Sequence, residues 1–292
     1  MNSTSALIWR DYLELTKPGV QALLFVSCIS GMLIGSKFSP TVSIFIFGLL
    51  GISFLAASAA VINHIFDSEI DAKMNRTASR PLVKGSITEF SASVFAAALY
   101  VSGSLMLLIY VNALTWILTS LTFIFYAFIY TRYLKFMTSQ NIVIGGLAGA
   151  MPPLLGWTAV SNTIEPNAWL LVLIVMVWTP PHFWALAVYR VDDYAEAAVP
   201  MLPVQKGIAF TKQHIVLYTL LLLASTMLPY AVGMFQELYL VAALILGLGF
   251  LYFSIKLYRD DTNASAMQTF AYSISYLAAL FGAMLVDQYL YL

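Results

Sequence analysis

Residues 42–71 read VSIFIFGLLGISFLAASAAVINHIFDSEID. The first part, 42–65, holds no Asp, Glu, Lys or Arg and is long enough to cross a bilayer, which takes about 20 mostly apolar residues. Lipid offers the backbone no hydrogen-bond partners, so a spanning segment must be helical. The second part carries Asp67, Glu69 and Asp71. This stretch therefore predicts a membrane helix with a polar site at its end.

The composition of the whole chain indicates a membrane protein. Of the 292 residues, 61% are hydrophobic and 10% are charged, and the mean hydropathy is +0.84. Soluble domains carry about 25% charged residues, so a soluble class is excluded. The formal net charge is zero, which gives no indication of nucleic-acid binding. We therefore expect the chain to be surrounded by membrane lipid and to bind no nucleic acid.

Eight further segments resemble the first in length and apolar character. We predict an all-α, polytopic membrane protein with about nine transmembrane helices, forming one integral membrane domain over residues 1–292. Glycines and Pro152-Pro153 in the fifth segment predict close packing and a kink. The nine predicted spans are 20–38, 42–65, 92–110, 114–130, 142–160, 168–189, 214–234, 238–257 and 268–289.

The basic residues segregate to one side of this nine-span scheme. If the amino terminus and the even-numbered loops share a face, 13 of the 14 Lys and Arg residues lie there, and Lys37 is the exception. The positive-inside rule then places the amino terminus in the cytoplasm and the carboxyl terminus in the periplasm. Residues 1–19 lack a secretory signal. We expect insertion into the bacterial inner membrane, with 66–91 and 190–213 as long cytoplasmic loops.

Three oxygen-bearing side chains follow a helical spacing at the end of the second span. Asn63, Asp67 and Asp71 stand at i, i+4 and i+8, so on a helix they share one face. Carboxylate and amide oxygens suit Mg²⁺, which is often held by one or two carboxylates together with substrate phosphates. Arg76 and Arg80 follow, and guanidinium groups bind phosphate oxygens well. The segment predicts a metal–phosphate site.

A plainer interpretation of the same segment is a solvated loop whose acids and bases pair for solubility. Its position argues against that interpretation, because the stripe begins inside a bilayer span, where uncompensated polar groups are costly. His64 lies beside the stripe and is interpreted mainly as a packing or hydrogen-bonding residue, with a haem contact as the alternative.

A second acidic cluster lies on the same side, at the start of the 190–213 loop. It consists of Asp192, Asp193 and Glu196. Two acidic loops that face one cavity could hold metal ions around a diphosphate, which would stabilise it as a leaving group. The alternative is a structural, solvated cluster.

Other candidates stand at helix ends or within an aromatic span. Lys17 begins the first span, and Tyr130, Arg132 and Lys135 stand at the end of the fourth. Each basic residue could also be an ordinary anchor at the membrane edge. His182 follows Pro180-Pro181 inside an aromatic span that includes Trp184, so His182 is either a satisfied core residue or a substrate contact.

These residues resemble the UbiA superfamily of intramembrane prenyltransferases, and most closely its haem-farnesylating branch. The segment 178–187, which reads WTPPHFWALA, and the segment 193–203 are specific to that branch, whereas the aspartate stripe indicates only the superfamily. The resembling segments cover most of the chain in order, and they are 15–18, 63–82, 141–146, 152–154, 178–187 and 193–203.

The resemblance implies a UbiA-type fold, with nine helices around a central cavity that opens to the membrane. It implies transfer of a farnesyl group from farnesyl diphosphate to a vinyl group of haem B, with addition of water, giving the hydroxyethylfarnesyl product haem O. It also implies Mg²⁺ as cofactor, with two ions expected, and a haem A synthase or a terminal oxidase as a downstream partner.

The resemblance also assigns roles to residues. Asp67, Asp71 and Asp193 are the expected catalytic residues. The expected metal ligands are Asn63, Asp67, Asp71, Asp192, Asp193 and Glu196. The expected diphosphate contacts are Lys17, Arg76, Arg80, Arg132 and Lys135. The expected haem or prenyl contacts are His64, Tyr130, His182 and Trp184. The chain departs from the family pattern at Gly19, Ser68 and Phe136, which bears on how many cations hold the diphosphate.

Two other functions fit parts of the pattern. One is prenylation of a quinone-ring precursor, against which the Pro180-Pro181-His182-Phe183-Trp184 segment argues. The other is transport of a cation or metabolite. Transporters tend to place binding acids near the bilayer midplane at broken helices, whereas these acids cluster at cytoplasmic helix ends beside arginines.

Overall fold

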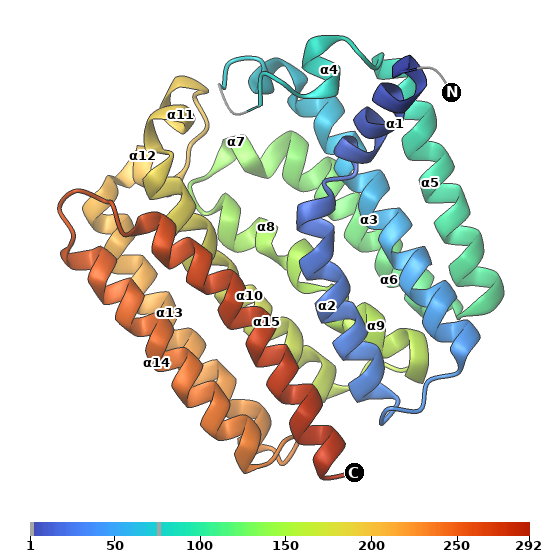
Figure 1. Ribbon diagram of the computed structural model, residues 1–292, viewed down its shortest axis with the longest axis vertical. Coiled ribbons are helices and arrows are strands. Elements are labelled where there is room, and N and C mark those ends of the chain that lie inside the picture. Colours follow the sequence, from blue (N-terminus) through green and yellow to red (C-terminus); the bar gives the residue numbers. More distant parts are fainter. Residues whose placement is uncertain (1–2, 75–76) are drawn as a thin grey trace.

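The chain folds into a bundle of helices. The computed structural model describes residues 3–74 and 77–292, with side chains from Trp9 onward, and contains no strand in these ranges. Figure 1 shows the helices side by side, with the carboxyl terminus at the end opposite to α1, α4 and α11. The predicted all-α class is confirmed.

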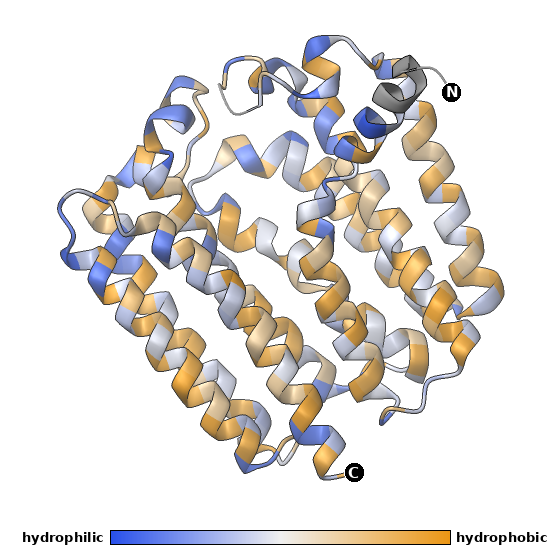
Figure 2. Cartoon of the chain, in the orientation of Figure 1, coloured by the Kyte–Doolittle hydropathy of each residue, from blue (hydrophilic) through white to orange (hydrophobic). Residues whose placement is uncertain are grey.

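Nine segments of the described chain are long and apolar enough to cross a membrane, and each predicted span overlaps one of them. They are α2 (Pro18–Gly35), α3 (Val42–Asp71), α5 (Glu89–Tyr110), Ala113–Met137, Asn141–Ser161, α10 (Pro166–Tyr189), α13 (Ile208–Ala231), α14 (Glu237–Arg259) and α15 (Ala266–Leu290). Shorter helices at the cytoplasmic side of the predicted topology are α1 (Ser3–Leu15), α4 (Pro81–Lys84), α11 (Val191–Glu196) and α12 (Leu202–Lys206). Figure 2 shows hydrophobic residues along the long helices and hydrophilic residues gathered near their ends.

Helices extend further into the two predicted loops than the hydropathy indicated. α3 has 30 residues and continues through Asp71, whereas the predicted span stops at residue 65. Asp67 and Asp71 are buried and paired, so the helix can continue where hydropathy falls. In the second predicted loop, α11 and α12 form and α13 begins at Ile208.

The fourth span contains a π-helix. It consists of α6 (Ala113–Ile124), the π-helix η1 (Phe125–Leu134) and α7 (Lys135–Met137), so it ends seven residues beyond the predicted boundary at 130. Inside η1, the Thr131 hydroxyl donates to the Tyr126 carbonyl oxygen at 2.8 Å. π-Helical turns are rare and often occur at functional sites because they rotate side chains out of α-helical register.

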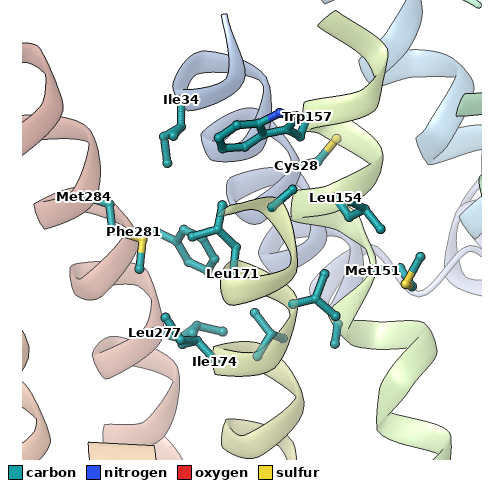
Figure 3. Close-up of a cluster of buried hydrophobic side chains, with 14 of the residues drawn as sticks. Cys28, Ile34, Met151, Leu154, Trp157, Leu171, Ile174, Leu277, Phe281 and Met284 are labelled. Atoms are coloured by element: carbon teal, nitrogen blue, oxygen red, sulfur yellow. The ribbon is translucent and has the colours of Figure 1, made fainter. Parts of the chain in front are cut away.

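The fifth span is broken, as Pro152-Pro153 predicts. It consists of α8 (Asn141–Ala150) and α9 (Pro152–Ser161), with Met151 between them. This span and α10 are the most buried, with 78% of each apolar window inside the protein, whereas the Ala113–Met137 window is 22% buried. Figure 3 shows part of the core that results, where Phe281 of α15 lies against Leu171 of α10 and Trp157 of α9 lies near α2.

Glycines bring α2 and α9 into backbone contact. A Cβ atom added at Gly31 would lie 2.0 Å from the Pro153 carbonyl oxygen, and one added at Gly156 would lie 2.1 Å from the Cys28 carbonyl oxygen. Small residues allow such close approach of membrane helices. The packing holds α2 in place, and α2 begins directly after Lys17.

Asp287 holds the end of the bundle that lies opposite to α1 and α4. Its carboxylate is fully buried and accepts hydrogen bonds from the backbone amides of Gln236 at 2.8 Å and Tyr239 at 2.9 Å. These amides belong to the start of α14, where unpaired N–H groups and the helix dipole favour a negative charge.

The Asp287→Asn variant should be less stable than the wild type. The amide has one acceptor oxygen and no charge, so a buried backbone amide loses its partner, at a cost of about 1–3 kcal/mol. Thermal unfolding in detergent, followed by size-exclusion chromatography, would measure a lower midpoint. Glu237→Gln is the matched control, because Glu237 is an exposed acid in the first turn of α14. Equal midpoints for the two variants would contradict this role of Asp287.

Candidate functional site

The predicted polar stripe exists and is buried. Asn63, Asp67 and Asp71 follow one another along the last two turns of α3, and they are 3%, 4% and 4% exposed. A carboxylate at such depth requires compensation by charge or hydrogen bonds.

Within residues 3–74 and 77–292, each residue of the stripe contacts a basic side chain, and the three bases come from three different segments. The Lys17 ammonium group donates to Asn63 Oδ1, and Arg80 pairs with Asp71 Oδ2. Lys135 Nζ lies 2.8 Å from Asp67 Oδ2. The structure therefore brings six predicted site residues together, namely Asn63, Asp67, Asp71, Lys17, Arg80 and Lys135.

The backbone positions two of these bases. Lys17 has a left-handed conformation (φ 53°) between α1 and α2, which is uncommon for a residue other than glycine. Lys135 stands where η1 passes into α7, and its carbonyl oxygen accepts a hydrogen bond from Asn141 Nδ2 at 3.0 Å. Arg80 directly precedes α4, which begins with Pro81.

One atom of the stripe is left without a partner. Asp67 Oδ1 is buried and accepts no hydrogen bond from any described residue, although Oδ2 of the same carboxylate pairs with Lys135. A buried carboxylate oxygen with free acceptor capacity fits a divalent cation. Among the described residues, no three His, Cys, Asp or Glu side chains gather closely enough to hold a metal ion. Protein acids alone would therefore leave its coordination incomplete.

The π-helix supplies the facing wall. Asn63 Nδ2 donates to Thr131 Oγ1 at 3.0 Å, which joins α3 to η1. The rings of Tyr126 and Tyr130 are stacked with their centroids 5.6 Å apart, and both rings lie within electrostatic range of Asp67. The Tyr130 ring packs on Gly145 of α8, where an added Cβ would lie 2.3 Å from it.

A pocket of about 320 Å³ opens beside the stripe. Its polar lining consists of Glu14, Lys17, His64 and Arg80. His64 is buried, and neither of its ring nitrogens has a hydrogen-bond partner among the residues that the structure describes. The burial of His64 agrees with the predicted packing role, whereas the predicted hydrogen bond is not present among the described residues.

The second acidic cluster belongs to α11. Figure 1 shows α11 at the end that carries α4 and α1. Asp193 pairs with Arg190 of its own segment at 3.3 Å, and Asp192 and Glu196 are exposed. In the part of the chain that the structure describes, no hydrogen bond or ion pair joins these acids to Asp67 or Asp71. Tyr194 of α11 does lie within electrostatic range of Tyr130.

The remaining candidates have other surroundings. Arg132 is exposed, with its guanidinium 5.6 Å from the centre of the Phe66 ring. Arg76 lies outside the described residues. His182 is stacked between Trp178 and Phe270, and its Nδ1 lies 2.6 Å from the Ser273 hydroxyl. Trp184 is fully buried against Tyr218 of α13. The structure does not bring Arg132, His182 or Trp184 to the stripe.

Sequence reasoning missed three residues that shape the site, namely Tyr126, Thr131 and Asn141. Tyr126 stands four residues before Tyr130, and this spacing could have indicated a shared helix face. No spacing rule predicts Thr131, because its contact with Asn63 depends on the π-helix.

The comparisons with known proteins agree with this architecture. The UbiA prenyltransferase family matches residues 24–281. A protoheme IX farnesyltransferase from Saccharophagus degradans is 53% identical over 97% of this chain and 93% of its own length. A solved structure of digeranylgeranylglyceryl phosphate synthase superposes with a TM-score of 0.80 at 22% identity, covering 97% of this chain and 99% of that chain.

A UbiA homologue from Archaeoglobus fulgidus bound to DMAPP and Mg²⁺ has the same fold, with a TM-score of 0.65 at 15% identity over 94% of this chain and 99% of that chain. These structures show the fold, and the family match and the curated relative cover nearly the whole sequence. The chain therefore belongs to the UbiA prenyltransferase family, together with the protoheme IX farnesyltransferases.

Proposed function

We propose that the protein transfers the farnesyl group of farnesyl diphosphate to a vinyl group of haem B, with addition of water, and so forms haem O. The observation that carries the transfer chemistry is the buried Asn63–Asp67–Asp71 stripe with one basic side chain on each member. The choice of haem as acceptor is supported by the 53% identity to a protoheme IX farnesyltransferase. Family membership favours this reaction over transport.

Mg²⁺ fits the stripe. Asn63, Asp67 and Asp71 would hold it, and Asp67 Oδ1 offers the unpaired oxygen. The homologue bound to DMAPP and Mg²⁺ supports the same use of the ion here. When bound, Mg²⁺ supplies positive charge that stabilises the diphosphate as a leaving group. The proposal includes a second ion, held by Asp193 with Asp192 and Glu196. Binding of this ion requires that Asp193 leave its present ion pair with Arg190.

The basic side chains would bind the diphosphate. Lys17, Arg80 and Lys135 already converge on the stripe, so their donors lie where phosphate oxygens would approach it. As the bond between the farnesyl C1 atom and the diphosphate oxygen breaks, the electron pair stays on that oxygen, and these cations stabilise the charge that develops there. Arg76 and Arg132 stay predicted contacts of the same anion.

The aromatic wall would face the allylic cation that forms on the farnesyl group. Tyr126 and Tyr130 are stacked within electrostatic range of Asp67, and each ring could contribute about 0.5–2 kcal/mol by cation–π attraction. The haem vinyl group then attacks C1 of the cation, and water adds to the carbon that is left electron-deficient, with release of a proton. His64, His182 and Trp184 stay predicted contacts of haem or of the prenyl chain.

Direct product analysis tests this function. Membranes that contain the protein are incubated with haem B, farnesyl diphosphate and Mg²⁺, and the porphyrins are separated and weighed by mass spectrometry. We expect the hydroxyethylfarnesyl porphyrin, and none when Mg²⁺ is chelated. A parallel incubation with 4-hydroxybenzoate tests the quinone-precursor alternative. Prenylated hydroxybenzoate without modified haem would contradict the proposal.

The cellular setting belongs to the same proposal. The protein is a multi-pass membrane protein by its nine apolar helices and its family. We place it as one domain in the bacterial inner membrane, with the amino terminus in the cytoplasm and the carboxyl terminus in the periplasm. Its product would pass to a haem A synthase or a terminal oxidase.

The Gly145→Ala variant should lose most transfer activity while the protein still folds. The new Cβ would lie 2.3 Å from the Tyr130 ring, so the ring must move away from its place beside Asp67. Misplacement of a positioning group by about 1 Å can cost on the order of 100-fold in rate. Initial rates of haem O formation would measure the loss.

Gly149→Ala is the matched control, because Gly149 lies one turn further along α8 and an added Cβ meets no atom within 4 Å. We expect it to keep nearly the wild-type rate. A wild-type rate for Gly145→Ala would show that the position of Tyr130 does not matter.

A further inference from the structure

In the part of the chain that the structure describes, each of the three stripe residues is paired with one of the three bases. Asn63 is paired with Lys17, Asp67 with Lys135 and Asp71 with Arg80. The same six side chains are the ones that a metal ion and a diphosphate would need. The oxygens that would bind the metal ion are therefore paired with the cations that would bind the phosphates.

We propose that these pairs exchange partners on loading, so that the metal ion and the prenyl diphosphate bind with strong positive coupling. In the ligand-free state the bases hold the stripe oxygens. In the loaded state the bases turn to the diphosphate oxygens and the stripe oxygens turn to the metal ion. This inference rests on the proposed function and concerns how that site is filled.

Burial makes the exchange necessary. Asp67 and Asp71 are each 4% exposed, and the side chains of Lys135 and Arg80 are 15% and 20% exposed. The two carboxylates have little access to water, and a buried charge without a partner is costly. Each charged group is therefore expected to leave its present partner only when another one is at hand.

Charge balance shows why neither ligand would bind well alone. The stripe has two carboxylates and the bases carry three positive charges, so the set is already net positive. A divalent cation alone would make it more positive and would leave Lys135 and Arg80 facing the cation. A diphosphate alone would draw the bases away and face two bare carboxylates. The two ligands together supply opposite charges, which restores neutrality in a region of low dielectric constant.

Metal binding without turnover tests the exchange. The probe is Mn²⁺, measured by the electron paramagnetic resonance signal of the free ion, with the purified wild-type protein in lipid nanodiscs. The second ligand is farnesyl S-thiolodiphosphate, in which sulfur replaces the bridging oxygen so that the farnesyl bond resists cleavage. We expect the analogue to raise the Mn²⁺ affinity by about tenfold or more, within the usual range of coupling between sites. Equal Mn²⁺ affinity with and without the analogue would overturn the proposal.

The Lys135→Met variant separates exchange from simple phosphate binding. Removal of the ammonium group frees Asp67 Oδ2, so Mn²⁺ alone should bind about fivefold or more tightly than to the wild type, and the analogue should add less. If Lys135 served only to bind phosphate, Mn²⁺ affinity without the analogue would stay at the wild-type value. That outcome would also overturn the exchange.

Two further variants guard the result. Lys84→Met removes an exposed positive charge at the end of α4, near Arg80, and should leave Mn²⁺ binding unchanged. If Lys135→Met fails to fold, Lys17→Met tests the same exchange at Asn63. These readouts need no haem, so the exchange can fail while haem O formation succeeds, and the reverse can also occur.

Discussion

The Asp67→Asn variant is expected to lose at least about 100- to 1,000-fold of its haem O formation, while it still inserts into the membrane. The substitution keeps the shape of the side chain but removes its charge and one acceptor oxygen. The unpaired Oδ1 atom and the ion pair with Lys135 both belong to this carboxylate, so one change affects the metal site and the placement of a phosphate-binding cation. Rates at saturating Mg²⁺, normalised to the amount of folded protein, would measure the loss.

The matched control for this variant is Glu69→Gln on the same helix. Glu69 is exposed and stands two residues further along α3, on a different face from the stripe. Glu69→Gln removes the same charge close to Asp67. Because Glu69 does not belong to the stripe, this variant should retain nearly the wild-type rate. If Asp67→Asn also formed haem O at the wild-type rate, the metal-binding role of the stripe would be wrong, although the prenyl transfer itself would stand.

The number and order of the membrane helices could be predicted because lipid imposes a length and a composition on each span. The break at Pro152-Pro153 could also be predicted, because proline cannot donate the backbone hydrogen bond that continues a helix. The predicted ends of α3 and of the fourth span were wrong, because hydropathy falls where buried, paired polar residues begin. Pairing of Asp67 with Lys135 lies outside what hydropathy measures.

The sequence indicated which residues form the site better than it indicated their contacts. Helical spacing places Asn63, Asp67 and Asp71 on one face, and this follows from the backbone repeat alone. The partners Lys17 and Lys135 come from segments 46 and 68 residues away, and their contacts depend on a left-handed residue and a π-helix. Neither feature has a reliable sequence signal. Convergence of the Asp193 cluster on the stripe stays a prediction.

The Gly156→Ala variant is expected to fold poorly, with a loss in stability of about 3 kcal/mol, the upper end of the usual cost of overpacking. The added Cβ would lie 2.1 Å from the Cys28 carbonyl oxygen and 3.1 Å from the Met32 amide nitrogen. Both are backbone atoms, so no side-chain rotation can relieve the contact, and α2 and α9 must separate. Thermal unfolding in detergent, followed by size-exclusion chromatography, would show a lower midpoint and less folded protein.

A separation of α2 from α9 should also displace Lys17 from the site, because α2 begins directly after Lys17. The folded fraction of Gly156→Ala should therefore form haem O more slowly than the wild type. Gly282→Ala is the control, since Gly282 lies in α15 and an added Cβ meets no atom within 4 Å. A wild-type midpoint for Gly156→Ala would mean that α2 and α9 are not in backbone contact, and the support that this packing gives to Lys17 would then be lost as well.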